Sequence, residues 1–198
     1  ISYSMDFVKK YINETISIAN LIDKDQIINF INQILLIKKN KGRIFFLGVG
    51  GSAANSSHAV NDFRKISNIE CYAPFDNFSE MSARINDDGW DNILLEWLKT
   101  SKLNKKDCIF ILSVGGGSIK KHVSLNLVNA LKLAKLKKAK VFGIVGKKDG
   151  FTYKNADNCI LIPTINKKNI TPHSESFQSV ILHLIVSHPK LKENSTKW

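Results

Sequence analysis

The stretch that decides the fold is RIFFLGVGGSAANSSHAVNDFR, residues 43–64. A short apolar run at 44–47 ends in the glycine turn GVGGS at 48–52, and a polar segment of helical length follows. This order predicts a buried strand, a tight turn and the start of a helix. Glycines let a backbone approach a ligand closely, and the free N–H groups of a helix N-terminus attract anions. The stretch therefore predicts a phosphate-binding turn, with the Ser52 hydroxyl as a further donor.

The turn by itself is not specific. GVGGS is neither the dinucleotide motif G-x-G-x-x-G nor the phosphate loop that ends in Gly-Lys-Ser/Thr, so neither ligand class follows from it. A glycine turn that only joins a strand to a helix would look the same. The pattern recurs, however: the apolar run 108–112 is followed by SVGGGS at 113–118 and by a second predicted helix. Two such turns favour a shared phosphate site with Ser113 and Ser118 as donors.

The rest of the chain predicts one α/β domain, residues 1–198, with N-terminal helices in 1–40 and an α/β core in 41–198. Strands alternate with segments of helical length, which is typical of a doubly wound parallel sheet that binds ligands at the carboxyl ends of its strands. The polar segment NDDGW at 86–90 predicts a loop, after which Asp91 would cap a helix. The predicted strands lie at 44–47, 69–73, 108–112, 141–146 and 159–163.

Composition excludes several classes of protein. A 43% hydrophobic and 23% charged chain of 198 residues is ordinary for a globular domain. Its formal charge of +12 comes from scattered lysines without a basic recognition motif, so we expect small anionic ligands rather than nucleic acid. Three separated cysteines without a C-x-x-C pair indicate a reducing compartment, the cytoplasm. No apolar run approaches the ~20 residues that cross a bilayer, so we expect no membrane partner.

Two polar pairs on predicted helices could carry chemistry. His58 and Asp62 are four residues apart and share a helix face. Near the C-terminus, Glu175 and His183 interrupt an apolar helix that has Pro172 in its first turn. Eight residues at ~100° each leave these two ~80° apart around the helix, so we expect both to reach one site. A histidine that only completes its hydrogen bonds in the core is the alternative.

Together these motifs resemble a known family. GVGGSAANSSH with Asp62, SVGGGS, NDDGW and the final E-x-x-Q-x-x-x-x-H resemble the phosphoheptose isomerases of the sugar isomerase (SIS) domain family, over almost the whole chain. The resemblance implies a flavodoxin-like SIS fold and a homotetramer with active sites between subunits. It also implies an enzyme that converts sedoheptulose 7-phosphate to D-glycero-D-manno-heptose 7-phosphate for lipopolysaccharide or capsule heptose. An isomerase of another sugar phosphate and a non-catalytic sugar-phosphate-binding module are the alternatives.

The resemblance also implies roles for individual residues. Asp62 would be the catalytic base and His183 its acid partner, with Asp87 orienting substrate hydroxyls. A zinc ion would be bound by His58, Asp62, Glu175 and His183, and the substrate and its phosphate by Gly50, Gly51, Ser52, Asn86, Asp87, Ser113, Gly115, Ser118 and Glu175.

The chain departs from the family at three places. Asp62 stands where the family has the longer glutamate, and Glu175 stands where it has glutamine. In the second turn, Val114, Gly115 and Gly117 replace residues that are richer in hydroxyl groups.

Overall fold

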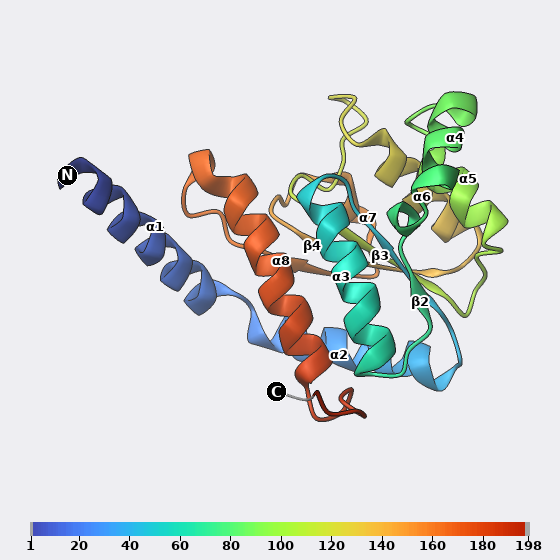
Figure 1. The fold of residues 1–198 in the computed structure, drawn as a ribbon, viewed down its shortest axis with the longest axis horizontal. Helices are drawn as coiled ribbons and strands as arrows, with labels where there is room; N and C mark the ends of the chain where they lie inside the picture. The colour runs from blue at the N-terminus through green and yellow to red at the C-terminus, as the bar shows by residue number, and fades with distance from the viewer. Residues whose placement is uncertain (1, 197–198) are drawn as a thin grey trace.

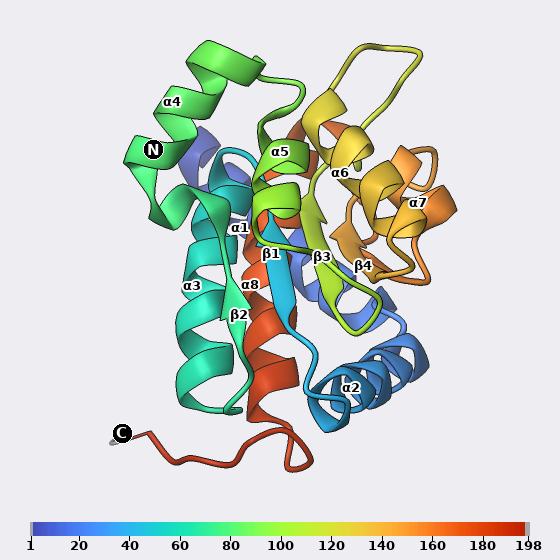
Figure 2. The same cartoon turned by 90° about the vertical axis from the view of Figure 1, so that its right-hand side faces the viewer.

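The structure, a computed structural model, describes residues 2–196, which form a parallel sheet flanked by helices (Figure 1). Five strands lie in the order β2-β1-β3-β4-β5, and every neighbouring pair is parallel. Figure 2 shows β2, β1, β3 and β4 side by side. Each strand overlaps one of the five predicted runs, so the predicted fold class is confirmed. The strands are β1 Ile44–Leu47, β2 Cys71–Tyr72, β3 Cys108–Ser113, β4 Lys140–Val145 and β5 Asn158–Leu161.

Helices bury both faces of the sheet, which is why the strands read as continuous apolar runs. Alternate side chains point to opposite faces: Phe46 and Phe110 pack with α2, α3 and α8, whereas Phe45 and Ile109 pack with α5 and α6. The first of these two cores holds α3 and α8 against the sheet. The helices are α2 Lys24–Lys39, α3 Gly51–Lys65, α5 Ile93–Thr100, α6 Leu125–Leu136, α7 Phe151–Asn155 and α8 Ile170–Ser187.

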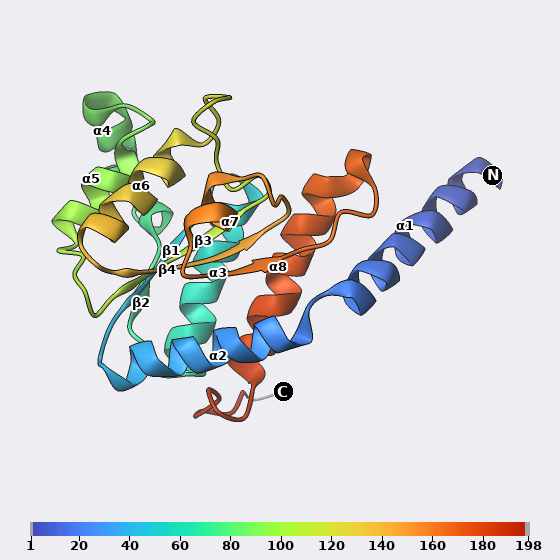
Figure 3. The ribbon, with the colours of Figure 1, turned by 180° about the vertical axis from the view of Figure 1, so that it is seen from behind.

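The two leading helices form as predicted, but they differ in their packing. Asp23 caps α2 by accepting a hydrogen bond from the Gln26 N–H at 3.0 Å. Helix α1, Ser2–Leu21, projects from the body in Figures 1 and 3. Five large apolar side chains are exposed in its first four turns, which leaves α1 with an uncovered apolar surface: Met5, Phe7, Val8, Ile12 and Ile16.

The predicted loop at 86–90 is wrong. Residues 86–88 form the last turn of helix α4, Phe78–Asp88, which Gly89 ends with φ 76°. Arg84 stabilises this turn because it pairs with Glu80 at 2.9 Å and with Asp88 at 3.5 Å, each four residues away. The predicted cap of the next helix is also wrong, since α5 follows Asn92 rather than Asp91.

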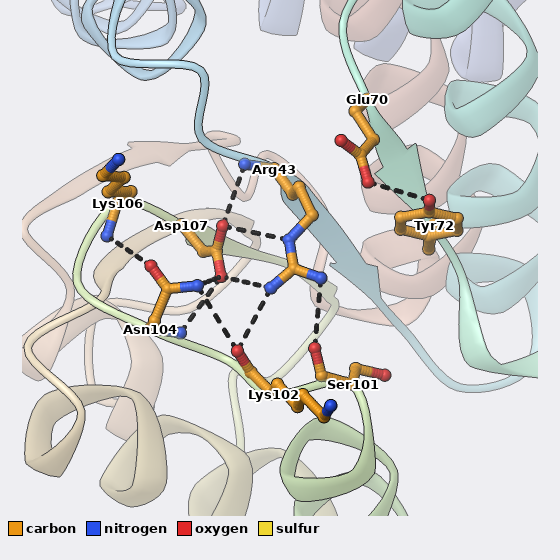
Figure 4. A network of polar contacts seen from close by, with 8 residues as sticks. All are labelled: Arg43, Glu70, Tyr72, Ser101, Lys102, Asn104, Lys106 and Asp107. Atoms are coloured by element: carbon orange, nitrogen blue, oxygen red, sulfur yellow. Dashed lines mark hydrogen bonds and ion pairs between the residues drawn. The ribbon is translucent and has the colours of Figure 1, made fainter.

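The amino ends of β1 and β3 are connected by an ion pair between Arg43 and the buried Asp107 carboxylate (Figure 4). The Asp107 carboxylate accepts hydrogen bonds from the Arg43 backbone N–H at 3.0 Å and from its guanidinium at 2.8 and 3.2 Å. It also accepts from the backbone and side chain of Asn104, at 3.0 and 2.8 Å. The hydrogen bond to Asp107 raises the pKa of Arg43. At the amino ends of these strands, the polar side chains therefore form hydrogen bonds with one another.

Within residues 2–196, no helix combines the length and the apolar character that crossing a bilayer requires.

Candidate active site

Both glycine turns lie at the carboxyl ends of neighbouring strands. The first follows β1 and the second follows β3, and these two strands pair in parallel through four residues each. In the strand order 2-1-3-4-5, β1 and β3 flank the point at which the chain reverses direction across the sheet. Ligands of open α/β sheets bind in the crevice outside this point. The turns are therefore positioned to form one binding site.

The first turn leads directly into α3. Gly50 has φ 62°, a conformation that favours glycine, and the helix begins at Gly51. Both glycines are exposed, whereas Ser52 is only 2% exposed and faces the interior. The part of this turn that a ligand can reach is thus the backbone of Gly50 and Gly51, and Ser52 is placed less favourably than the sequence predicts.

The second turn does not lead directly into a helix, contrary to the prediction. A small hairpin bridged by Ser118 and Val123 intervenes, and α6 begins only at Leu125. The Ser113 hydroxyl accepts from the Gly116 N–H at 3.0 Å, and the Ser118 hydroxyl accepts from the Lys121 N–H at 3.2 Å. Each serine oxygen is held by a loop N–H, and its own hydrogen remains able to donate to an anion.

Three of the predicted site residues meet between α3 and α8, which run side by side (Figure 1). The Nε2 atoms of His58 and His183 are 2.9 Å apart. The Asp62 Oδ2 atom lies 3.2 Å from His58 Nε2 and 3.3 Å from His183 Nε2. The other Asp62 oxygen accepts from the Asn61 amide at 3.0 Å, which fixes the carboxylate toward the two rings. Both histidine side chains are about half exposed, so a ligand can reach the group.

This group has the chemistry of a metal site. Its three ligand atoms form a triangle with sides of 2.9, 3.2 and 3.3 Å. Tetrahedral zinc with bonds of ~2.0–2.1 Å separates its ligands by ~3.3 Å, so the triangle matches one face of the tetrahedron within a small shift. Two imidazoles and one carboxylate that leave a fourth position open are typical of catalytic zinc sites.

The fourth predicted ligand, Glu175, lies elsewhere. Eight residues of α-helix rise ~12 Å along the axis, so the small angle between Glu175 and His183 does not bring them to one point. The Glu175 carboxylate instead packs against Gly51 at the first glycine turn. The structure thus separates this residue from the three-residue group and places it at the turn.

Asn86 and Asp87 are exposed on the last turn of α4. The Asn86 amide donates to the Asp87 carboxylate at 2.8 Å. Figures 1 and 2 show α4 beyond the same end of the sheet as the start of α3. Helix α4, whose last turn contains the pair, therefore lies on the side of the molecule where the first glycine turn begins α3.

Sequence reasoning missed a polar group that connects α1 to α8. The Glu14 carboxylate is 5% exposed and accepts from Asn166 at 2.8 Å and from Asn169 and His173 at 2.9 Å. The ring of His173 also packs on Tyr11, with centroids 4.4 Å apart. The partners are more than 150 residues away in the sequence, and no local pattern signals them.

Cysteine nucleophiles do not fit this site. The three thiols are free and buried, and burial raises the pKa of Cys71 and of Cys159 to about 12 and that of Cys108 well above its ordinary value. Since the thiolate is the reactive form, these side chains are inert at neutral pH.

Comparisons with known proteins find relatives over most of the chain, although no protein-family model matches it. The chain is similar to the phosphoheptose isomerase of Aneurinibacillus thermoaerophilus, with 25% identity over 190 residues that cover 91% of this chain and 90% of that protein. It is also similar to the lincomycin biosynthesis protein LmbN of Streptomyces lincolnensis, with 32% identity over 158 residues that cover 74% of this chain and 56% of that protein.

Among solved structures, phosphoheptose isomerase GmhA from Neisseria gonorrhoeae matches with a TM-score of 0.78 and 20% identity, covering 92% of this chain and 97% of that one. The chain therefore has the fold of this phosphoheptose isomerase. Several of its sequence relatives are phosphoheptose isomerases, which confirms the resemblance that the motifs indicate.

Proposed function

We propose that the chain is an aldose–ketose isomerase that converts sedoheptulose 7-phosphate to D-glycero-D-manno-heptose 7-phosphate. The observation that carries the proposal is the approach of Asp62 to His183, at 3.3 Å, from two helices that are distant in sequence. An enediol mechanism needs such a carboxylate base next to an acid. The relatives named phosphoheptose isomerase match the chain along most of its length, which supports the choice of substrate.

The reaction divides between the two side chains. Asp62 removes a proton from C1 of the open-chain ketose while His183 donates a proton to the C2 oxygen, which gives an enediol. Asp62 then returns its proton to C2, and His183 takes the proton of the C1 hydroxyl, which leaves the aldose. Asp62 is shorter than the family's glutamate, but both imidazole contacts of its carboxylate are within 3.3 Å. Asp87 is the proposed group that orients substrate hydroxyls.

His58, Asp62 and His183 are the proposed zinc ligands. Zinc held by His58 Nε2, Asp62 Oδ2 and His183 Nε2 would polarise the substrate's carbonyl oxygen as a Lewis acid, and the proton transfers would then fall to the other oxygen of Asp62 and to Nδ1 of His183. The hydrogen bond from Asn61 keeps the Asp62 carboxylate directed at the two rings. Glu175 is absent from this proposed ligand set because it lies at the glycine turn.

The proposed assembly is a homotetramer with active sites between subunits. Seven residues of α3, a rise of ~10 Å, separate Gly51 from His58, so the glycine turn and the three-residue group of one chain lie apart. The group is exposed and α1 has an uncovered apolar surface, both of which suit contact with a second copy.

Buried free thiols are compatible with the reducing cytoplasm as the compartment.

Incubation of the purified protein with sedoheptulose 7-phosphate tests the proposal. We expect the aldose product by NMR, together with zinc in the same preparation by elemental analysis. A panel of shorter ketose phosphates identifies an isomerase of another sugar. Binding of the sugar phosphates without turnover of any of them would contradict the proposal and favour a non-catalytic binding module.

A further inference from the structure

A hollow at the amino ends of β3 and β4 is surrounded by lysines. It has a volume of about 470 Å³ and lies beside the C-terminal half of α2. Lys140 is the first residue of β4, and Lys105 and Lys106 lie in the loop before β3. Within residues 2–196, no acidic side chain lines this hollow. The six residues of β3 span ~20 Å, so the hollow is remote from the glycine turns at the carboxyl ends of the strands.

The three lysines have no counter-charge. Their side chains are exposed, and their ammonium groups form no hydrogen bond and no ion pair within the described part of the chain. The Asp107 carboxylate, next in sequence to Lys106, is already bound by Arg43 and Asn104. Like charges around one hollow repel one another and attract anions. A bound anion would therefore relieve a repulsion that the folded chain leaves uncompensated.

The backbone around the hollow is fixed by hydrogen bonds. The Lys106 N–H donates to Asn104 Oδ1 at 3.0 Å, and the Lys140 N–H donates to the Asp107 backbone oxygen at 2.9 Å. Gly42 packs so closely on the Lys106 carbonyl oxygen that no larger residue fits there. Figure 4 shows the Lys106 side chain extending away from the Asp107 carboxylate. The network that joins β1 to β3 thus also holds two of the lysines at the hollow.

The end of α2 does not cancel this positive charge. A helix C-terminus is partly negative because its last carbonyl groups are unpaired. Here the N–H groups of residues 40, 41 and 42 donate to the carbonyl oxygens of residues 36, 38 and 37, each at 3.0 Å. The last turn of α2 also contains Lys38 and Lys39. The field in the hollow is therefore set mainly by the lysines.

The α2 side of the hollow suits an uncharged ring. Leu36 is 50% exposed, with Gln33 one turn before it and Asn40 one turn after it on the same helix face. An apolar side chain flanked by two amides can pack on a heterocyclic base and form hydrogen bonds with its edge. Lysine ammonium groups, in contrast, bind phosphate as point charges. The hollow thus has one part for a base and one part for phosphates.

We propose that this hollow binds a nucleoside diphosphate or triphosphate, whose phosphates contact Lys105, Lys106 and Lys140 and whose base packs on Leu36. The site is separate from the proposed active site between α3 and α8. Nucleotide binding there does not depend on which reaction that active site performs.

Isothermal titration calorimetry with ADP, without sugar or divalent metal, tests the proposed site. Wild type should bind one ADP per chain. The double variant Lys106→Gln with Lys140→Gln should bind ADP at least tenfold more weakly, because it loses two charge-assisted contacts to phosphate. Pyrophosphate, which lacks the base, should bind wild type at least threefold more weakly than ADP.

Two control variants should bind ADP as wild type does. Lys10→Gln removes an exposed lysine from the projecting helix α1. Ser118→Ala changes the second glycine turn and leaves the hollow intact. The double variant should also turn over sedoheptulose 7-phosphate at the wild-type rate, which separates this site from the proposed function.

Several results would overturn the proposal. One is a wild-type protein that binds no ADP, and another is a double variant that is folded by circular dichroism and binds ADP with wild-type affinity. An equal loss of ADP affinity in Ser118→Ala would place the nucleotide at the glycine turn instead. Equal affinities for pyrophosphate and ADP would exclude recognition of the base. Tighter binding of a single-stranded oligonucleotide than of ADP would exclude a small ligand as the natural occupant.

Discussion

The two ends of the parallel sheet contain similar polar residues in opposite states. At the amino ends of β1 and β3, the buried Asp107 carboxylate is met by Arg43 and Asn104, which satisfy both of its oxygens. At the other end, the Glu175 side chain has no hydrogen-bond or ion-pair partner within residues 2–196, and Gln178 has a buried Nε2 atom without one. A carboxylate whose hydrogen bonds are satisfied stabilises a fold, whereas a partly exposed carboxylate without a partner, such as that of Glu175, is available to a ligand. We infer that the amino ends of β1 and β3 contribute mainly to stability and that their carboxyl ends are the ones that bind the substrate.

Replacement of Asp62 should have the largest effect. Asp62→Asn keeps the shape of the side chain but cannot accept the substrate's proton, so we expect turnover to fall ~10²- to 10⁴-fold. The thermal midpoint should stay near the wild-type value because this group is partly exposed. Asp25→Asn, on the exposed first turn of α2, is the control. Wild-type turnover by Asp62→Asn would contradict the proposed role of Asp62 as the catalytic base.

Replacement of Asp107 tests the opposite end. Asp107→Asn removes the counter-charge of the Arg43 guanidinium, which is 23% exposed, and leaves its hydrogen bonds to the buried carboxylate incomplete, so we expect a loss of about 1–3 kcal/mol of the free energy of unfolding. Urea denaturation measures the loss, and turnover per folded molecule should not change. A loss of less than ~1 kcal/mol in the free energy of unfolding would show that the amino end of the sheet does not contribute more to stability than the carboxyl end.

Replacement of His58 should affect metal binding before it affects folding. His58→Ala removes one of the three proposed ligands, so its zinc affinity should fall by more than the ~10- to 100-fold that losing an outer-shell partner costs. Competition with a fluorescent chelator measures the affinity. His122→Ala, in the exposed hairpin after the second turn, is the control. Equal zinc affinity of both variants and wild type would contradict the metal assignment.

Glu14 should give the smallest effect, and one that disappears in acid. Hydrogen bonds from Asn169, His173 and Asn166 lower the pKa of Glu14 from 4.5 to about 2. A lowered folded-state pKa stabilises the protein above pH 4.5, and this contribution is lost as the pH falls toward 2. The thermal midpoint of wild type should therefore exceed that of Glu14→Gln at pH 6, and the two should converge as the pH drops. A difference that does not depend on pH would contradict this reading.

Local patterns predict most of the fold. The apolar runs place all five strands, and the Asp23 cap and Pro172 mark two helix starts. The pattern at 86–90 misleads because turn-forming residues there are held in a helix by the pairs of Arg84 with Glu80 and Asp88. Helical spacing also predicts that His58 and Asp62 share a face.

The remaining features of the site depend on three dimensions. The small angle between Glu175 and His183 around the helix axis ignores their ~12 Å separation along it. Sequence reasoning therefore predicts one shared site for two residues that lie apart in the structure. The attachment of Glu14 to His173 depends on how α1 meets α8 and has no local signal. The meeting of His183 with Asp62 is likewise decided by how α3 packs against α8.

The most direct test of the central claim is turnover of sedoheptulose 7-phosphate by wild type and by His183→Gln, measured on samples with known zinc content. We predict aldose formation by the wild type and at least a 100-fold loss in the variant, because a neutral amide cannot exchange protons with the substrate oxygens. Equal rates for the two proteins, or no aldose from zinc-loaded wild type, would contradict the account.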